Sequence, residues 1–151
     1  MAISQKETID LLLQSYSMEL ETVMNYLANS TNLDGVRAEE IKKSLSADVG
    51  GEIGHAQQLA SRIKQLGGHI PGSKGVTLGS QIQPVTDTTD VCGVIKSVIA
   101  AEEAACAQYK KIIRAVDGED YVTQDLCVRL LADEEGHLVQ FKGFLKEYIG
   151  N

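Results

Sequence analysis

One arrangement of metal-binding side chains occurs twice in this sequence. Glu19 is followed after 33 residues by a Glu-x-x-His segment, Glu52–His55, and Glu102 is followed after 32 residues by a second, Glu134–His137. Residues i and i+3 of a helix lie on one face, so the Glu and the His of each segment can bind one metal ion. Two helices that each give a Glu, with two that each give a Glu-x-x-His pair, form a two-metal site in four-helix bundles. The candidate catalytic and metal-ligating residues are therefore Glu19, Glu52, His55, Glu102, Glu134 and His137.

The four glutamates of this set are predicted to be buried. Each lies in a row of apolar residues at helical spacing, and the row of Glu19 contains Leu12, Tyr16, Val23 and Tyr26. The nearby Glu21 and Glu103 lie in polar rows, so we expect these two side chains to point outward. Tyr26 has two interpretations, either as a hydrogen-bond donor to the metal site or as an ordinary core residue.

Four carboxylates in apolar surroundings need compensating charge, because a buried charge without a partner shifts its pKa until it is neutral. No Lys or Arg lies on these rows near the glutamates, and His55 and His137 balance only part of the charge. Two divalent cations would balance all of it. Several oxygens and one imidazole per ion suit iron or manganese, and zinc less uniquely. The alternative is a metal-free bundle in which the glutamates are protonated or bridged by water.

Helical periodicity and turn residues divide the chain into four helices. Ser4 and Glu7 form a capping box at the start of the first helix, and Gly67–Gly68 ends the second. Residues 69–86 contain both prolines and show no clear period, so they form one long connection. This order predicts an all-α four-helix bundle whose long crossover makes the second and third helices parallel. The predicted helices span residues 4–31, 38–66, 89–116 and 121–149.

Length and composition predict a single domain over residues 1–151 and exclude several classes of protein. The chain has 14 Lys and Arg against 21 Asp and Glu, a net charge of −7, which opposes nucleic-acid binding through a basic patch. No apolar stretch is long enough to span a bilayer or to act as a signal peptide, so no membrane partner is expected. Three scattered cysteines indicate a cytoplasmic protein. Cys106 and Cys127 are either small buried residues or a disulfide or redox pair.

The motif segments resemble the bacterioferritin branch of the ferritin superfamily over nearly the whole chain. The similar segments are Met18–Leu20 with Tyr26, Glu52–Ala56 followed by Arg62–Ile63 and Leu66–Gly68, Ala101–Glu102, and Asp133–His137, of which the last is the most specific. The resemblance implies a ferritin-like fold and a ferroxidase centre with two iron ions. In that centre Glu52 and Glu134 are bridging or terminal ligands. Glu19 and Glu102 are terminal ligands, and each iron has one His.

Three features depart from the pattern of that family. Ile53 stands where bacterioferritins have the Met that ligates haem between two subunits, so we expect haem to be absent or weakly bound. Ala47 stands at the position of an inner-surface His. Only 14 residues follow His137, so we expect no short fifth helix of the kind that lines pores in 24-subunit cages. The expected homo-oligomer is a cage of 12 or 24 subunits, and a dimer stays open.

The resemblance implies iron storage and detoxification. Fe(II) would be oxidised to Fe(III) at the two-iron centre with O2 or H2O2 as the oxidant, and the product would be stored in an oligomeric cage. The alternative is a di-iron redox enzyme without storage, such as a peroxide reductase of the rubrerythrin type. That family has a further carboxylate one turn along the third helix, and the corresponding Ile99 and Ala105 are apolar here. A third interpretation is a bundle in which the metal is only structural.

Overall fold

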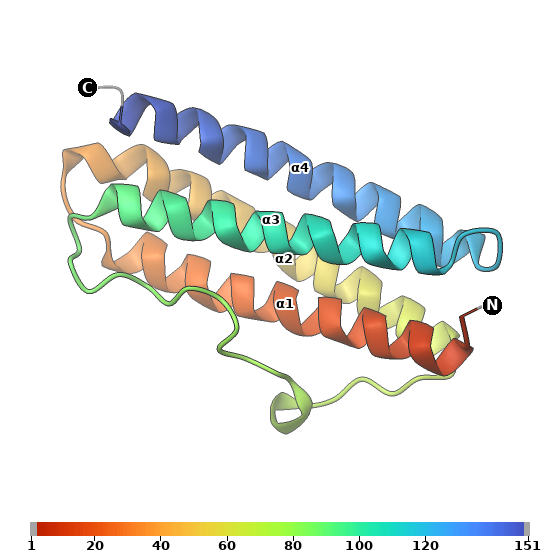
Figure 1. Cartoon of the computed structure of the whole chain (residues 1–151). Helices are drawn as coiled ribbons and strands as arrows, with labels where there is room; N and C mark the ends of the chain where they lie inside the picture. Colours follow the sequence, from red (N-terminus) through yellow and green to blue (C-terminus); the bar gives the residue numbers. More distant parts are fainter. Residues whose placement is uncertain (1–2, 150–151) are drawn as a thin grey trace.

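The computed structural model describes residues 3–149, and these residues form four long helices and no strand (Figure 1). Helix α1 spans Gln5–Asn32, α2 spans Glu39–Gln65, α3 spans Val91–Ala115 and α4 spans Tyr121–Ile149. Two short 3-10 turns, η1 at Val36–Ala38 and η2 at Ser73–Gly75, lie in the connections. The predicted all-α class and the four predicted helices are confirmed, and every helix end lies within two residues of its predicted position.

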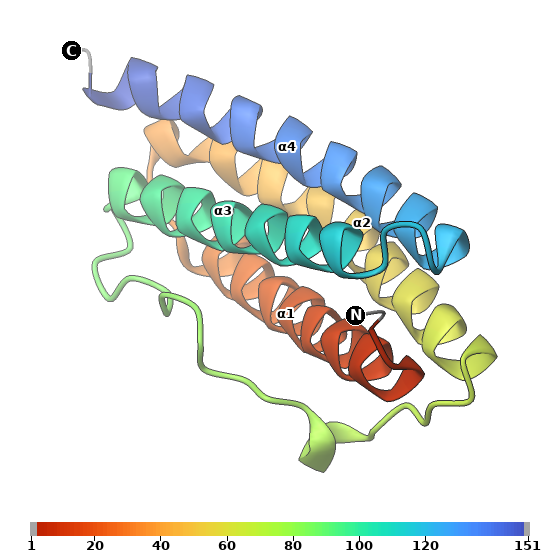
Figure 2. The same cartoon turned by 45° about the vertical axis from the view of Figure 1, so that its right-hand side comes forward.

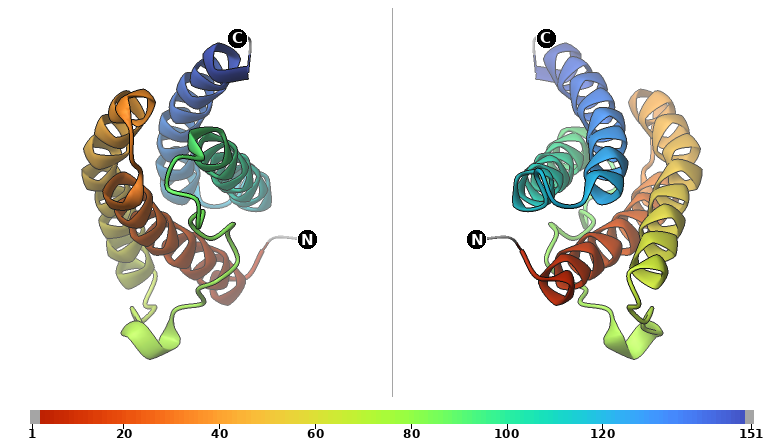
Figure 3. Two further views of the ribbon diagram at one scale, coloured as in Figure 1. Left: turned by 90° about the vertical axis from the view of Figure 1, so that its left-hand side faces the viewer. Right: turned by 90° about the vertical axis from the view of Figure 1, so that its right-hand side faces the viewer.

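The four helices form two antiparallel hairpins that pack against each other. Helix α1 pairs with α2 and α3 pairs with α4, and the end-on views of Figure 3 show the hairpins as two layers. The crossover of residues 66–90 runs back along the bundle beside α1, so α3 begins at the same end as α2 (Figures 1 and 2). Helices α2 and α3 are therefore parallel, as predicted, and the middles of the four helices lie at one level.

Apolar packing fills the bundle on either side of its middle. One cluster lies where α2 and α3 begin, and its fully buried members include Tyr26, Ile41, Leu45, Ile95 and Phe141. A second cluster lies where α2 and α3 end, and its fully buried members include Leu12, Leu59, Ile63, Ile112 and Leu130. Burial of each such side chain contributes about 1.5–3 kcal/mol. The polar residues at mid-height are thus held between two closely packed apolar halves.

Side-chain caps fix where α1 and α4 begin. The Ser4 N–H donates to Glu7 Oε2 at 2.9 Å and the Glu7 N–H donates to Ser4 Oγ at 3.2 Å, which is the predicted capping box. At the start of α4, Asp120 Oδ1 accepts the Thr123 N–H at 3.0 Å. The same oxygen accepts from Arg62 Nη2 of α2 at 2.7 Å. This ion pair joins the two hairpins and fixes the position of α4 along α2.

The expectation that Glu21 points outward is wrong. Its side chain is buried, with only 3% of its surface exposed. The Glu21 carboxylate accepts the backbone N–H of Gly79, and the Ser80 hydroxyl donates to its other oxygen at 2.6 Å. Nearby, the Gln81 side chain donates to Thr22 Oγ1 at 2.9 Å. The polar row on α1 therefore faces the crossover, which supplies donors to it, and not the solvent.

We predict that Glu21→Ala lowers the free energy of unfolding of the metal-free protein by about 1–3 kcal/mol, because two crossover donors lose a buried acceptor. Urea unfolding at fixed protein concentration measures this change. The control is Glu103→Ala, which removes a half-exposed carboxylate paired with Lys142 at 3.0 Å. That pair lies in solvent, so its loss should change stability by less than about 1 kcal/mol. Equal effects of the two substitutions would contradict the anchoring role of Glu21.

Candidate metal centre

The six predicted ligand residues come together at mid-height of the bundle. Their side chains converge from all four helices, and their ligand atoms form two groups, within each of which all atoms lie within 4.8 Å of one another. The first group consists of Glu19, Glu52, His55 and Glu134. The second group consists of Glu52, Glu102, Glu134 and His137. Two glutamates, Glu52 of α2 and Glu134 of α4, therefore belong to both groups.

The two shared glutamates face the two groups with different oxygens. Glu52 Oε2 lies 3.4 Å from His55 Nδ1, and Glu52 Oε1 lies 3.3 Å from His137 Nδ1. Glu134 repeats this arrangement, with Oε1 at 3.0 Å from His55 Nδ1 and Oε2 at 3.3 Å from His137 Nδ1. A carboxylate has two acceptor oxygens, so each of these side chains can bridge two neighbouring cations.

Each unshared glutamate accepts a hydrogen bond from a tyrosine of the other hairpin. The Tyr26 hydroxyl of α1 donates to Glu102 of α3, and the Tyr109 hydroxyl of α3 donates to Glu19 of α1. Burial raises the pKa of both tyrosines well above the usual value, so both remain protonated donors. Tyr26 is thus a hydrogen-bond donor, one of its two interpretations. Tyr109 was not identified from the sequence, although it follows Glu102 by the same seven residues that separate Glu19 from Tyr26.

The shared and unshared glutamates have opposite pKa shifts. Burial raises the pKa of Glu102 to about 8 and raises the pKa of Glu19 well above its usual value. Burial acts in the same direction on Glu52 and Glu134, but the two imidazoles beside them outweigh it and lower both pKa values. When no metal is bound, these shifts favour the protonated form of the two unshared glutamates and the ionised form of the two shared glutamates.

The two imidazoles carry the charge that offsets the shared glutamates. Three neighbouring glutamates, of which Glu102 contributes most, raise the pKa of His137 to about 12. Burial lowers the pKa of His55, but hydrogen bonds with three glutamates, Glu134 foremost, raise it well above its usual value. The directions of these shifts favour imidazolium ions beside the two ionised shared glutamates and protonated carboxyl groups at Glu19 and Glu102 in the metal-free centre.

Several buried polar atoms of this centre lack a hydrogen-bond partner. Among the described residues they include both carboxylate oxygens of Glu52, Oε2 of Glu134 and Nδ1 of His137. An unsatisfied buried polar atom costs about 1–3 kcal/mol. Cations bound between the two glutamates would give each of these atoms a partner. The residues present therefore fit two metal ions, and three carboxylates with one imidazole in each group suit iron or manganese.

The two cysteines near this level of the bundle are buried free thiols. Burial raises the pKa of Cys106 to about 11 and that of Cys127 to about 12, so both are protonated at neutral pH. In the structure they fill space as small apolar side chains, which is one of the two interpretations made from the sequence.

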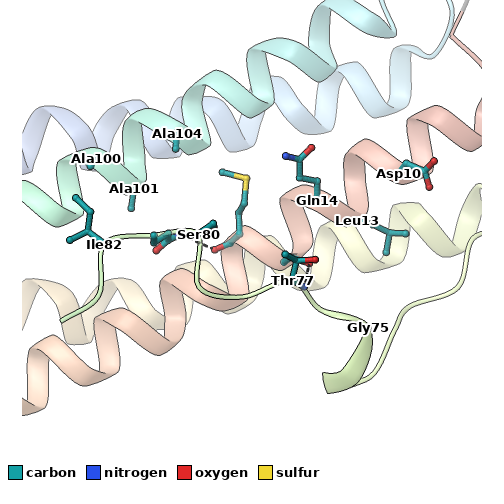
Figure 4. Close-up of a pocket in the computed structure, with 13 residues that line it drawn as sticks. Asp10, Leu13, Gln14, Gly75, Thr77, Ser80, Ile82, Ala100, Ala101 and Ala104 are labelled. Atoms are coloured by element: carbon teal, nitrogen blue, oxygen red, sulfur yellow. Dashed lines mark hydrogen bonds between the residues drawn. The ribbon is translucent and has the colours of Figure 1, made fainter.

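A cavity of about 670 Å³ opens between α1, α3 and the crossover (Figure 4). Its lining includes Met18 and Ala101, which directly precede Glu19 and Glu102 in the chain, but none of the six candidate ligands. Among the lining residues that the structure describes, only Asp10 is charged. The cavity therefore lies beside the candidate centre and lacks the ligands for a metal site of its own.

Comparisons with known proteins identify the family. Residues 9–148 match the ferritin-like domain family. A bacterioferritin from Desulfovibrio desulfuricans is 26% identical over 138 residues, which cover 90% of this chain and 73% of that protein. A dodecameric thioferritin, the bacterioferritin-related protein of Bacteroides fragilis, has a similar fold, with a TM-score of 0.89 and 23% identity over 97% of this chain and 88% of that one. The solved Desulfovibrio desulfuricans bacterioferritin has a TM-score of 0.81 and 24% identity over 97% and 84% of the two chains. The chain belongs to the ferritin superfamily and is bacterioferritin-like.

Proposed function

We propose that this protein oxidises Fe(II) to Fe(III) at a two-iron centre and stores the product inside a closed homo-oligomer. The observation that carries this proposal is the position of Glu52 and Glu134, which each direct one oxygen to each imidazole. The similar bacterioferritin of Desulfovibrio desulfuricans has a diiron site, which supports iron over other cations.

In this proposal the two shared glutamates would bind both ions. Glu19 and His55 would complete the ligands of one ion, and Glu102 and His137 would complete those of the other. The hydroxyls of Tyr26 and Tyr109 hold the unshared carboxylates in place from the opposite hairpin. All four glutamates are at most 3% exposed, so the protein around them keeps bulk water away from the site.

Bound iron supplies the redox chemistry. Each Fe(II) gives up one electron, and two electrons with two protons from solvent reduce O2 to H2O2, or H2O2 to water. The side chains of the centre hold the two ions close together, so that both electrons can reach one oxidant. Carboxylate oxygens are hard anionic ligands, and their charge favours Fe(III) over Fe(II) at the same position.

The storage part of the proposal requires a closed assembly of many copies. Apolar side chains remain exposed on α1 and α2, including Met24 at 56%, Leu27 at 51% and Ile53 at 42%. Contacts between copies through these helices would cover them. The similar protein of Bacteroides fragilis is dodecameric, so we propose a cage of 12 or 24 subunits. Because Ile53 has no ligating atom, we expect no stoichiometric haem in that assembly.

None of the helices between residues 3 and 149 combines the length and the apolar character needed to cross a membrane.

A cytoplasmic location stays part of the proposal because three scattered cysteines do not form a secreted-type disulfide framework. The net charge of −7 favours metal cations over nucleic acid as partners.

We predict that Glu52→Ala and Glu134→Ala each slow rapid Fe(II) oxidation by more than about 100-fold. Loss of a residue that only hydrogen-bonds a metal ligand typically lowers activity by about 10–100-fold, and loss of a ligand shared by both ions should lower it further. Stopped-flow absorbance of Fe(III) formation measures the rate. Glu103→Ala is the control, because it removes a carboxylate next to Glu102 that pairs with Lys142 in solvent. Oxidation at the unaltered rate in either bridging variant, with helicity retained, would defeat the proposal.

Metal binding should release protons. At pH 7 the metal-free centre retains protons on both imidazoles and on Glu19 and Glu102, whose pKa values are all raised. Ligands must lose these protons to bind cations, so we predict that each of these four side chains releases close to one proton as two ions bind. For the same reason the apparent affinity should fall as the pH is lowered. Titration with Co(II) in weakly buffered solution with a pH indicator measures the release, and its absence would show that these groups are not ligands.

We predict that the protein in solution has a mass of twelve or twenty-four times its 16.3 kDa subunit at physiological salt. The exposed apolar side chains of α1 and α2 are the physical reason, because burial between copies removes them from water. Light scattering coupled to size-exclusion chromatography measures the mass. A stable monomer would exclude storage and would favour the di-iron redox enzyme without a cage.

A further inference from the structure

The cavity beside the candidate centre is lined mainly by apolar and uncharged side chains. Its apolar side chains come from α1, α3 and the crossover (Figure 4), and they are Leu13, Met18, Ile82, Ala100, Ala101 and Ala104. The one charged side chain among its described lining residues, Asp10, pairs with Lys6 at 2.7 Å. A lining of this kind offers few ligands to a cation and gives an apolar molecule contacts on several sides.

Polar side chains of the cavity wall already have partners in the chain. Ser17 Oγ accepts the backbone N–H of Thr77 at 3.4 Å. The side chain of Gln81 donates to the backbone oxygen of Met18 at 3.2 Å, and the Ser80 hydroxyl donates to a buried carboxylate of α1 at 2.6 Å. These bonds hold the crossover against α1. Because they use the polar atoms of the wall, they leave the cavity poorly suited to a polar ligand.

The cavity reaches the level of the candidate centre. Ala101 lies in its wall and directly precedes Glu102, and Met18 lies in its wall and directly precedes Glu19. Consecutive Cα atoms are about 3.8 Å apart, so the wall and the two unshared ligands belong to the same turns of α1 and α3. The side chains that α3 places on this wall are alanines, and they leave open a space between α1 and α3 that larger side chains would fill.

The opposite face of the bundle, between α2 and α4, has a different character. Asp133 Oδ2 lies there at 3.1 Å from His55 Nε2, and Asp48 Oδ1 lies at 3.9 Å from His137 Nε2. The side chain of His137 is 21% exposed, so the centre is open to water on this face. Carboxylates attract cations, and the cavity between α1 and α3 has no comparable group at this level among its described residues. The centre therefore lies between a charged face and an apolar cavity.

We propose that the cavity between α1, α3 and the crossover is the route by which O2 reaches the two-iron centre, and that Ala101 and Ala104 keep this route open. The inference rests on the proposed function and names its oxidant. O2 is small and apolar, so it favours apolar space over water, whereas Fe(II) and H2O2 are strongly hydrated and favour the charged face. At the centre O2 takes one electron from each of two Fe(II), with two protons from solvent, and leaves as H2O2.

Xenon tests the cavity without any metal, because this apolar gas enters apolar cavities. We predict that xenon NMR of the metal-free assembled protein shows saturable binding, and that Ala104→Leu, which fills the cavity, abolishes it. Ala104 is exposed in the cavity wall, so leucine there does not disturb the core. The matched control is Ala107→Leu, which changes an exposed alanine of the same helix outside the cavity lining and should leave xenon binding intact.

Oxidation kinetics distinguish the two oxidants. We predict that Ala104→Leu raises the O2 concentration needed for half-maximal Fe(II) oxidation by at least about fivefold and leaves the maximal rate close to that of the unaltered protein. Anaerobic oxidation by H2O2 and the binding of two Co(II) per chain should stay unchanged. Ala101→Leu, nearer the ligands, should raise the O2 requirement further. Stopped-flow absorbance at a series of O2 concentrations measures these effects, with Ala107→Leu again as the control.

Each outcome of these experiments has a distinct meaning. Equal xenon binding in Ala104→Leu and Ala107→Leu, or an unchanged O2 requirement in Ala104→Leu, would overturn the cavity as the route. Equal slowing with O2 and with H2O2 would show a general effect on the centre and would also overturn it. Failure of the unaltered protein to oxidise Fe(II) with either oxidant would instead contradict the proposed function, while xenon would still report whether the cavity takes an apolar gas.

Discussion

The structure depends on keeping four glutamate side chains buried next to one another. Glu19, Glu52, Glu102 and Glu134 are each at most 3% exposed. Four uncompensated charges there would cost several kcal/mol each, more together than the net stability of about 5–15 kcal/mol of an ordinary domain. The metal-free chain avoids this by keeping protons on two carboxyls and by pairing the other two with imidazolium. Protons and metal cations are thus alternative ways to neutralise one centre, and only cations give its unpaired atoms a partner.

The crossover turns a repeat in the sequence into an approximate twofold arrangement in space. Because it returns the chain to the end where α2 begins, each hairpin contributes one shared Glu, one unshared Glu, one His and one Tyr. The tyrosines bond across, Tyr26 to Glu102 and Tyr109 to Glu19, so neither hairpin completes its part of the centre alone. Assembly of the bundle and assembly of the site are therefore one event.

The helices and the six converging side chains could be predicted from the sequence, because apolar periodicity and i, i+3 spacing are local properties. The seven-residue interval that identified Tyr26 also applied to Tyr109, so that contact was available without a structure. The burial of Glu21 was not available, since residues 69–86 have no period and their position against α1 is a tertiary property. The contact between Asp133 and His55 joins two helices and likewise depends on how far α4 is displaced along α2.

Glu21 and Glu52 show what distinguishes a structural carboxylate from a candidate ligand. Both are buried, at 3% and 1% exposure. The two oxygens of Glu21 accept from Gly79 and Ser80, so its acceptors are satisfied by the chain. Neither oxygen of Glu52 has a hydrogen-bond partner, and the two face the imidazoles of His55 and His137 at 3.4 and 3.3 Å. Burial alone therefore does not identify a metal ligand. A buried carboxylate whose oxygens the fold leaves without donors, and which faces other such groups, is the arrangement that only a cation completes.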